Sequence, residues 1–144
     1  MQRELVLILD FGSQYTQLIA RRIREQKVYC EIHPYTISPS QMRAIEPRAI
    51  VLSGSPSSTL QESSPTVDPG LFELGVPVLG ICYGLQLFCR LLGGRVESAS
   101  EREYGPAVIE VDRPEGILAK LGQGEKTPVW MSHGDRVVGL PDGF

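Results

Sequence analysis

Short, largely apolar runs alternate with helical patterns over the first 94 residues of the chain. The runs are Leu5–Leu9, Val28–His33, Arg48–Ser53 and Val76–Ile81. Runs of this length without a clear polar face suit strands that are buried on both sides, as in a parallel sheet. We therefore predict four buried strands that belong to one parallel sheet.

Helical periodicity lies between these runs. The first helix is expected soon after the first strand, with Ser13 as its N-cap. Its predicted apolar stripe consists of Tyr15, Leu18, Ile19 and Ile23. A short helix should follow Ser38–Pro39, and another should cover Leu71–Leu74. A helix that is apolar nearly all round is expected over Tyr83–Leu92, where Gly93–Gly94 ends it.

The pattern changes after Gly94. Arg95–Ser98, Ala107–Val111 and Val129–Met131 are expected to form antiparallel strands joined by turns. The whole pattern predicts an α/β fold, with a mostly parallel central sheet, helices on both faces and a small antiparallel extension after Gly94. The polar segment Ser55–Asp68 is long for a loop in a compact domain, and such loops are usually functional or mobile.

Composition and charge exclude several classes of partner. The chain of 144 residues is 42% hydrophobic and 22% charged, as expected of a globular domain, and its net charge is −3. The negative charge argues against binding to nucleic acid or to an acidic membrane surface. Leu5–Leu9 is too short for a signal peptide, and no run approaches the roughly 20 apolar residues of a membrane span. The three cysteines have no metal-ligand or disulfide spacing, so we expect no metal, a reducing compartment and a cytoplasmic protein.

The clearest chemical signal is Gly80-Ile-Cys82-Tyr-Gly84, which follows a predicted strand and begins a predicted helix. It parallels the Gly-x-Ser-x-Gly elbow of hydrolases, in which the nucleophile lies on a tight, strained turn. The flanking glycines remove side chains that would collide there. The helix N-terminus directs N–H groups at the site, which favours the thiolate and can stabilise an oxyanion. Cys82 is therefore the predicted nucleophile for an amide or similar carbonyl, whereas Cys30 and Cys89 are expected in the core.

A thiol nucleophile needs a base, which is usually a histidine. The chain contains two, His33 and His133. His33 lies at a predicted strand end and is expected to be structural or on the surface. His133 lies in the polar segment Trp130–Asp135, which follows a strand and suits a loop at a site. The motif leaves three roles open for His133, namely base, substrate contact and turn cap.

Four segments that together span nearly the whole chain resemble one family. Val78–Gln86 resembles the nucleophile motif of class I, triad-type glutamine amidotransferases. Ile8–Gln17, Arg102–Gly105 and Val129–Asp135 are similar to motifs in the glutaminase domain of the GMP synthase family. The four segments together are more specific than the elbow alone. The resemblance implies the flavodoxin-like fold of class I glutamine amidotransferases.

The same resemblance implies a reaction. Cys82 would attack the side-chain amide of glutamine, form a γ-glutamyl thioester and release ammonia. A synthetase part, either a fused domain or a separate subunit, would use that ammonia with ATP to convert XMP to GMP in purine biosynthesis. No cofactor is implied for the glutaminase domain, whereas ATP and Mg belong to the synthetase part. A homodimer through that part is a further implication.

The resemblance also implies roles for individual residues. The backbone N–H groups of Ser55 and Tyr83 would form the oxyanion hole. The glutamine would be contacted by Gln86, Ser132, His133, Gly134 and Asp135. On this interpretation His133 is a substrate contact and not the base.

Two departures from the family pattern bear on activity. Leu52-Ser-Gly-Ser-Pro56 stands where the family usually has Leu-Ser-Gly-Gly-Pro, and Ser55 would be strained by about 1 kcal/mol or more if its φ had to be positive. The family's catalytic His and Glu lie in a His-Pro-Glu motif that residues 1–144 do not contain, and an ATP-binding glycine-rich motif is also missing. We therefore expect 1–144 to be an incomplete glutamine amidotransferase domain without the synthetase domain, and slow at hydrolysing glutamine.

Two alternative functions remain open at this point. A self-contained cysteine hydrolase of the same superfamily would use His133 as its base. His133→Ala would then abolish acylation of Cys82, whereas it would only weaken glutamine binding if His133 were a contact. A non-catalytic docking module would bind a partner through Ser55–Asp68 and the helix arginines, although the intact elbow argues against it.

Overall fold

The computed structural model describes residues 4–144, with the side chains of all of them except residues 102 and 103. The chain forms two compact units. Unit 1 contains the residues up to Ala99 together with Asp135–Phe144, and unit 2 contains Ser100–Gly134. The predicted strands and helices that precede Gly94 all lie in unit 1.

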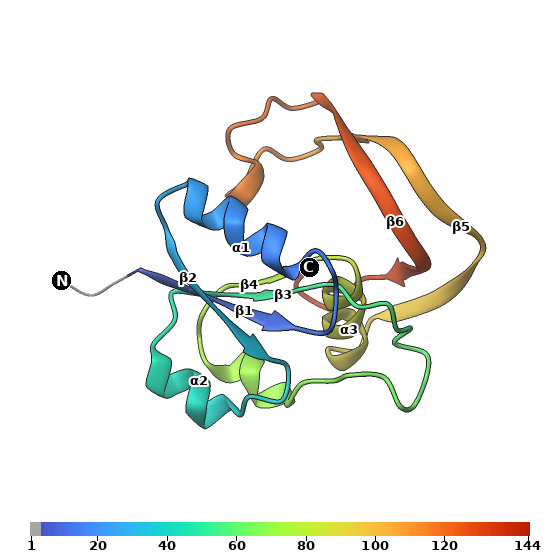
Figure 1. Cartoon of the computed structure of the whole chain (residues 1–144). Coiled ribbons are helices and arrows are strands. Elements are labelled where there is room, and N and C mark those ends of the chain that lie inside the picture. Colours follow the sequence, from blue (N-terminus) through green and yellow to red (C-terminus); the bar gives the residue numbers. More distant parts are fainter. Residues whose placement is uncertain (1–3) are drawn as a thin grey trace. The chain divides into compact units, whose positions relative to one another are not determined.

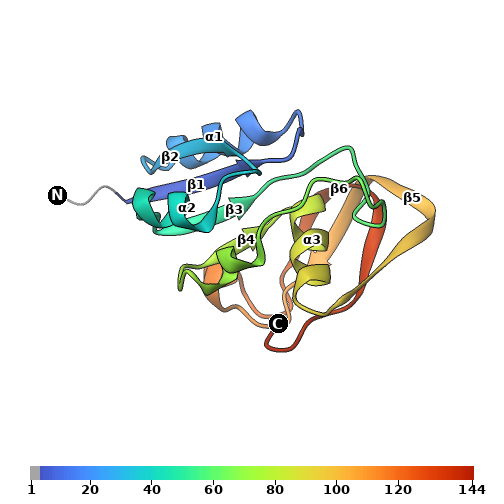
Figure 2. The ribbon, with the colours of Figure 1, turned by 90° about the horizontal axis from the view of Figure 1, so that it is seen from below.

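A four-stranded parallel sheet forms the centre of unit 1. Its strands are β1 (Leu5–Asp10), β2 (Tyr29–Pro34), β3 (Ala49–Leu52) and β4 (Val78–Gly80). They lie in the order β2-β1-β3-β4, as Figure 2 shows. The prediction of a parallel sheet is confirmed. The prediction that all four strands are buried is wrong for β2 and β4. Each of these two edge strands pairs with a single strand among the described residues, and Tyr29 and Leu79 are 44% and 41% exposed.

Helix α1 (Thr16–Glu25) covers one face of this sheet (Figure 1). The buried cluster on this face consists of Ile8, Ala20, Cys30 and Val51. Ile19 and Ile23 of α1 pack against it. Because successive side chains of a strand point to opposite faces, Ile8 belongs to this cluster whereas its neighbours in β1 belong to the other.

The predicted details of α1 are partly wrong. Tyr15 and Leu18 are exposed, and the buried face of the helix passes instead through Thr16 and Ala20. Tyr15, not Ser13, is the N-cap residue. The Ser13 hydroxyl accepts the N–H of Tyr15 at 3.0 Å, so it stabilises the turn that precedes the helix.

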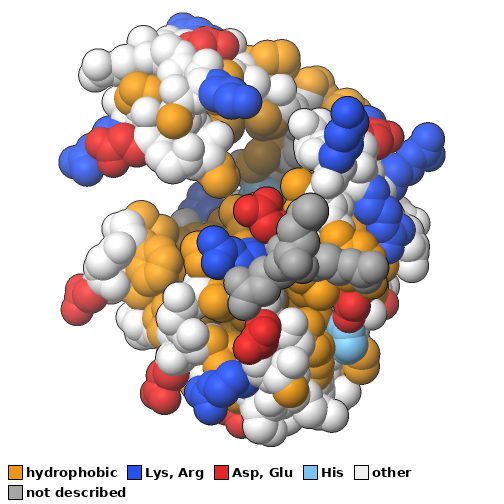
Figure 3. Space-filling view, turned by 90° about the vertical axis from the view of Figure 1, so that its left-hand side faces the viewer, with side chains coloured by type: hydrophobic (Ala, Val, Ile, Leu, Met, Phe, Trp, Pro, Cys, Tyr) orange, Lys and Arg blue, Asp and Glu red, His pale blue; other side chains and the backbone are white. Residues whose placement is uncertain are grey.

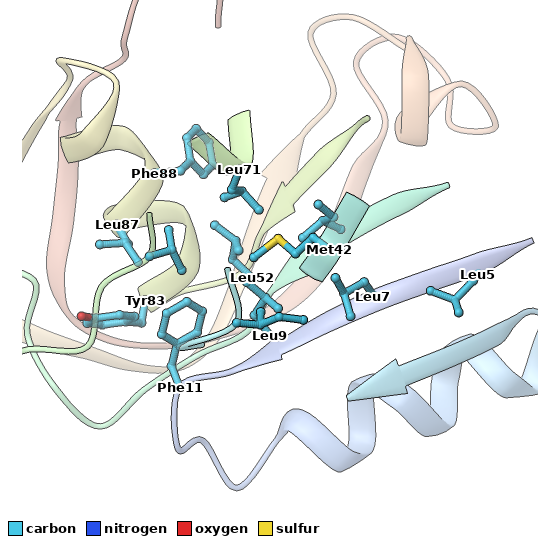
Figure 4. Close-up of a cluster of buried hydrophobic side chains, with 13 residues drawn as sticks. Leu5, Leu7, Leu9, Phe11, Met42, Leu52, Leu71, Tyr83, Leu87 and Phe88 are labelled. Carbon is cyan, nitrogen blue, oxygen red and sulfur yellow. The ribbon is translucent and has the colours of Figure 1, made fainter. Parts of the chain in front are cut away.

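Three shorter elements cover the opposite face, namely α2 (Pro39–Ile45), the 3-10 helix η1 (Pro69–Glu73) and α3 (Tyr83–Leu91). Helix α2 begins with a capping box, in which Ser38 and Gln41 each accept a backbone N–H from the other. The prediction of helices on both faces is confirmed. The cluster on this second face consists of Leu5, Leu7, Leu9, Phe11, Ile37, Met42, Ile50, Leu52, Val67, Leu71, Tyr83, Leu87 and Phe88. Figure 4 shows Tyr83 beside Phe11 at one end of this cluster.

Strands β5 (Arg95–Glu110) and β6 (Lys126–Gly139) form a two-stranded antiparallel sheet, with the 3-10 helix η2 (Gly116–Leu118) between them. The antiparallel extension is therefore confirmed, but the prediction of three short strands is wrong. Gly105 has φ 122°, which lets β5 continue through the Gly-Pro pair that looks like a turn in the sequence.

No helix in the described part of the chain, residues 4–144, is long and apolar enough to cross a membrane.

Basic and acidic side chains are mixed on the surface, with hydrophobic side chains exposed between them, on the face that Figure 3 shows. Arg21 and Arg22 of α1 form short-range ion pairs with Glu25. Such exposed pairs contribute little to stability.

Candidate active site

Cys82 lies between β4 and α3, where it is the N-cap residue of α3. Its φ is 51° and its ψ is −113°, a conformation that costs a residue other than glycine about 1–3 kcal/mol. The strained turn that the sequence predicts is thus present. Cys82 is exposed, whereas Cys30 and Cys89 are buried. The turn therefore presents one thiol of the three to small molecules in solution.

Both glycines of the elbow are required by close packing. A Cβ atom on Gly80 would lie 2.6 Å from the Cα atom of Leu85 and 2.7 Å from Cδ1 of Phe88. A Cβ atom on Gly84 would lie 2.6 Å from the carbonyl carbon of Leu52. Gly80 lets α3 pack directly against β4, and Gly84 lets the first turn of α3 pack directly against β3. This packing fixes the direction in which the helix N-terminus points.

Desolvation raises the pKa of the Cys82 thiol, because atoms packed around the sulfur disfavour its charged form. The helix N-terminus would by itself lower the pKa of Cys82. Because the pKa is raised nonetheless, the prediction that the turn favours the thiolate is not supported. No hydrogen bond or charged group within the described residues offsets the desolvation. A neutral thiol of this kind needs a base before it can attack a carbonyl.

Alkylation of Cys82 by iodoacetamide in residues 1–144 should therefore rise about tenfold per pH unit through the range near 8.5 where a free cysteine titrates. The thiolate is the reactive form, and a raised pKa keeps its fraction small until higher pH. Mass spectrometry of the Cys82 peptide measures the rate, and the buried Cys30 and Cys89 serve as internal references. A rate that levels off below pH 8 would contradict the raised pKa.

The two backbone N–H groups predicted for the oxyanion hole belong to segments that flank Cys82. Tyr83 is the first residue of α3, and its position is fixed because its side chain is buried, packs on Phe11 and donates its hydroxyl to the Pro65 carbonyl. Ser55 follows Gly54, where a Cβ atom would lie 3.9 Å from Cβ of Cys82. Within the described chain, neither N–H donates to another backbone group.

Ser55 is not strained. Among the described residues other than glycine, a positive φ occurs at Lys27, Glu46 and Cys82. The Ser55 hydroxyl accepts the N–H of Ser57 at 3.1 Å. A serine therefore fits this position without the backbone strain that a positive φ would impose.

The predicted glutamine contacts are arranged differently from the sequence-based expectation. Ser132, His133, Gly134 and Asp135 lie inside β6 and not in a loop. Apolar strand-forming residues on both sides of this polar segment, such as Val129 and Val137, explain why the strand continues through it. The first three of the four belong to unit 2, and Asp135 belongs to unit 1.

The structure brings Gln86 and Asp135 together. The Gln86 side chain is buried, and its Nε2 donates to the backbone oxygen of Asp135 at 3.0 Å. The carboxylate of Asp135 in turn accepts the hydroxyl of Ser58. Gln86 therefore connects α3 to β6, and Asp135 connects β6 to the polar loop after β3.

The segment Ser55–Asp68 is held in place rather than loosely attached. Ser58 is its centre, because its hydroxyl donates to Asp135 and its carbonyl accepts the Ser64 hydroxyl. Val67 is buried in the larger core cluster. The sequence gives no signal for Ser58, since five serines lie in this segment and residue type alone does not distinguish them.

Other predicted residues lie apart from this arrangement. The motif Arg102–Gly105 lies in β5, but the side chains of residues 102 and 103 are outside the described part, and Tyr104 is exposed. His33 lies on β2, where its Nε2 is 3.0 Å from a carboxylate oxygen of Glu31. The described residues contain no group of three or more His, Cys, Asp or Glu that could hold a metal ion.

A family profile described as glutamine amidotransferase class-I matches residues 7–144. The chain belongs to this family. The match covers most of β1 and all of the elbow and β6, so all the candidate residues of the amidotransferase site lie within it. The central parallel sheet, the helices and the antiparallel pair are those of class I glutamine amidotransferases.

Several curated relatives indicate a more specific group within this family. The GMP synthase (glutamine-hydrolyzing) of Natranaerobius thermophilus is 56% identical over 144 residues, which cover 100% of this chain and 28% of that protein. That of Maridesulfovibrio salexigens is 58% identical over 139 residues, covering 96% of this chain and 27% of that protein. The amidotransferase chain thus spans little more than a quarter of the length of these relatives, and it corresponds to their N-terminal part.

A solved structure is also similar. The crystal structure of a Thermoplasma acidophilum protein, described as a GMP synthase subunit, has a TM-score of 0.75 and 29% sequence identity. The similarity covers 99% of this chain and 70% of that one. Both comparisons point to the glutaminase part of GMP synthases within the amidotransferase family.

Proposed function

We propose that this chain hydrolyses glutamine as the ammonia-producing part of an enzyme that converts XMP to GMP. The observation that carries the proposal is the thiol of Cys82, exposed at a φ of 51° between two backbone segments with N–H groups that have no backbone acceptor in the described chain. The high identity to proteins named GMP synthase (glutamine-hydrolyzing) supports the choice of glutamine and of this pathway.

The reaction follows from these groups. A base removes the Cys82 proton, and the sulfur attacks the side-chain amide carbon of glutamine. The N–H groups of Ser55 and Tyr83 stabilise the oxyanion that forms. The tetrahedral intermediate collapses by breaking the C–N bond, and the nitrogen takes up the proton and leaves as ammonia. Water then attacks the γ-glutamyl thioester, which releases glutamate and restores the thiol.

On this proposal the base is the histidine of the family's His-Pro-Glu motif, which residues 1–144 do not contain. Gln86, Ser132, His133, Gly134 and Asp135 position the substrate glutamine. A synthetase domain or subunit that binds ATP, Mg and XMP receives the ammonia, and a homodimer forms through that part. Neither a metal nor a cofactor takes part in glutamine hydrolysis itself, and the reaction takes place in the cytoplasm.

Incubation with glutamine should produce a Cys82 thioester, detected after an acid quench as a mass increase of glutamine minus ammonia. Residues 1–144 should release ammonia far more slowly than a protein that continues through a His-Pro-Glu motif, because the base is missing. Asparagine, which is one methylene shorter, is the matched control and should give no adduct. Absence of the adduct from the longer protein would overturn the proposed function. Equal ammonia release from the two proteins would overturn the proposed origin of the base.

A further inference from the structure

Three polar side chains meet where β1, α1 and β3 come together, and none of them has a role in the reaction above. They are Asp10 at the end of β1, Thr16 at the start of α1 and Ser53 directly after β3. Thr16 is 2% exposed and Ser53 is 0% exposed. Burying two hydroxyl groups is unfavourable unless both are hydrogen-bonded, so their arrangement needs a reason.

The three side chains form one hydrogen-bonded chain. Thr16 Oγ1 lies 3.1 Å from Asp10 Oδ1 and 3.2 Å from Ser53 Oγ. The Thr16 hydroxyl is the donor in both contacts, and the Ser53 hydroxyl donates in turn to the carbonyl of Gly54 at 3.5 Å. The Ser53 oxygen then accepts the N–H of Phe11 at 3.4 Å, and Asp10 Oδ1 accepts the N–H of Gly12 at 2.8 Å.

This chain fixes the segment that leads to the oxyanion hole. The N–H of Ser53 donates to the Leu9 carbonyl at 3.2 Å, so both its backbone and its side chain are held by the β1–α1 region. The next residue, Gly54, packs beside Ser13 and Cys82, since a Cβ atom there would lie 3.4 Å and 3.9 Å from their side chains. The direction of the chain at Ser53 therefore sets where the N–H of Ser55 points.

We propose that Ser53 and Thr16 are positioning residues for the oxyanion hole. They act on the substrate only through the backbone of Gly54 and Ser55, which they hold beside Cys82. The proposal rests on the proposed function, because it assigns the Ser55 N–H to the oxyanion of glutamine hydrolysis. It predicts a selective defect, in which reactions that develop an oxyanion slow down while the intrinsic reactivity of the thiol stays the same.

The test uses the full natural protein and two reactions of Cys82. Glutamine hydrolysis develops an oxyanion, whereas alkylation by iodoacetamide displaces iodide and needs no oxyanion hole. Ser53→Ala and Thr16→Val should each lower kcat for glutamine by about 10- to 100-fold, with little change in KM, because misplacement of a catalytic group by about 1 Å has effects of this size. Their alkylation rates at Cys82 should stay within about twofold of the wild-type rate.

Thr16→Ser is the matched control, because it keeps the hydroxyl that Thr16→Val removes. The kcat of Thr16→Ser for glutamine should lie much closer to the wild-type value than that of Thr16→Val. If Ser53→Ala fails to fold, the two Thr16 variants carry the test alone. Variants that hydrolyse glutamine at the wild-type rate would overturn the positioning role. So would a parallel loss of hydrolysis and alkylation, since that marks a purely structural effect. A wild-type protein that hydrolyses no glutamine would instead overturn the proposed function, and the positioning role with it.

Discussion

Cys82→Ala should lower glutamine-dependent GMP formation in the full natural protein by about 10⁴-fold or more, because removing a catalytic nucleophile typically has an effect of this order. Formation of GMP from added ammonium should stay near the wild-type rate, since this route bypasses the thioester. Alanine also keeps the turn, because it accepts the φ of 51° no better and no worse than cysteine does. The two rates are measured side by side, with glutamine or an ammonium salt as the nitrogen source.

Cys30→Ala is the matched control for this experiment. Cys30 is buried in the smaller core cluster and donates to the Ala20 carbonyl at 3.5 Å, away from the elbow. Its substitution should reduce stability slightly and leave both rates close to those of the wild type. If Cys82→Ala still used glutamine, another nucleophile would be required and the assignment of Cys82 would be wrong. A loss of both rates would show that the variant is misfolded rather than chemically impaired.

Gly84→Ala should reduce the free energy of unfolding by about 3 kcal/mol, which is at the upper end for overpacking in a core. The new methyl group would lie 2.6 Å from the carbonyl carbon of Leu52, and neither the backbone of β3 nor that of α3 can move away freely. Urea denaturation followed by far-UV circular dichroism measures the change.

Gly139→Ala, in the same unit, is the control for Gly84→Ala. A Cβ atom there would lie 3.4 Å from Cβ of Arg95, which is ordinary van der Waals contact. Its effect on the free energy of unfolding should stay within about 1 kcal/mol. Equal effects of the two substitutions would show that the close approach of α3 and β3 does not require a glycine at position 84.

The sequence predicts the elbow and the parallel sheet well because their signals are local and strong. Continuous apolar runs that alternate with helical patterns are typical of parallel strands, and a glycine on either side of Cys82 indicates the tight turn that the structure contains. The buried face of helix α1 is harder to predict. The hydrophobic periodicity of the helix fits two neighbouring faces. The face that is buried includes the polar Thr16, which is accommodated by hydrogen bonds to Asp10 and Ser53. Contacts between residues 37 positions apart cannot be read from a periodic pattern.

In the candidate site, too, the sequence does not reveal features that depend on the surrounding structure. The sequence identifies the segment Ser132–Asp135 but not its extended conformation, because polar residues and a glycine suggest a loop and the flanking strand residues decide otherwise. It also suggests a thiolate from the position of Cys82 at a helix N-terminus. The pKa of Cys82 depends as well on how closely other atoms surround the sulfur, and that packing has no local signal in the sequence.

The backbone at position 82 also bears on how such a chain changes over evolutionary time. With φ at 51°, this position suits glycine better than any residue with a side chain, by about 1–3 kcal/mol. Stability alone would therefore favour the loss of the thiol, and only the chemistry opposes that drift. In a duplicated copy that no longer needs ammonia, replacement of Cys82 by glycine would relieve the backbone strain and stabilise the fold. A glycine at this one position would mark a copy that has kept the architecture and given up the reaction.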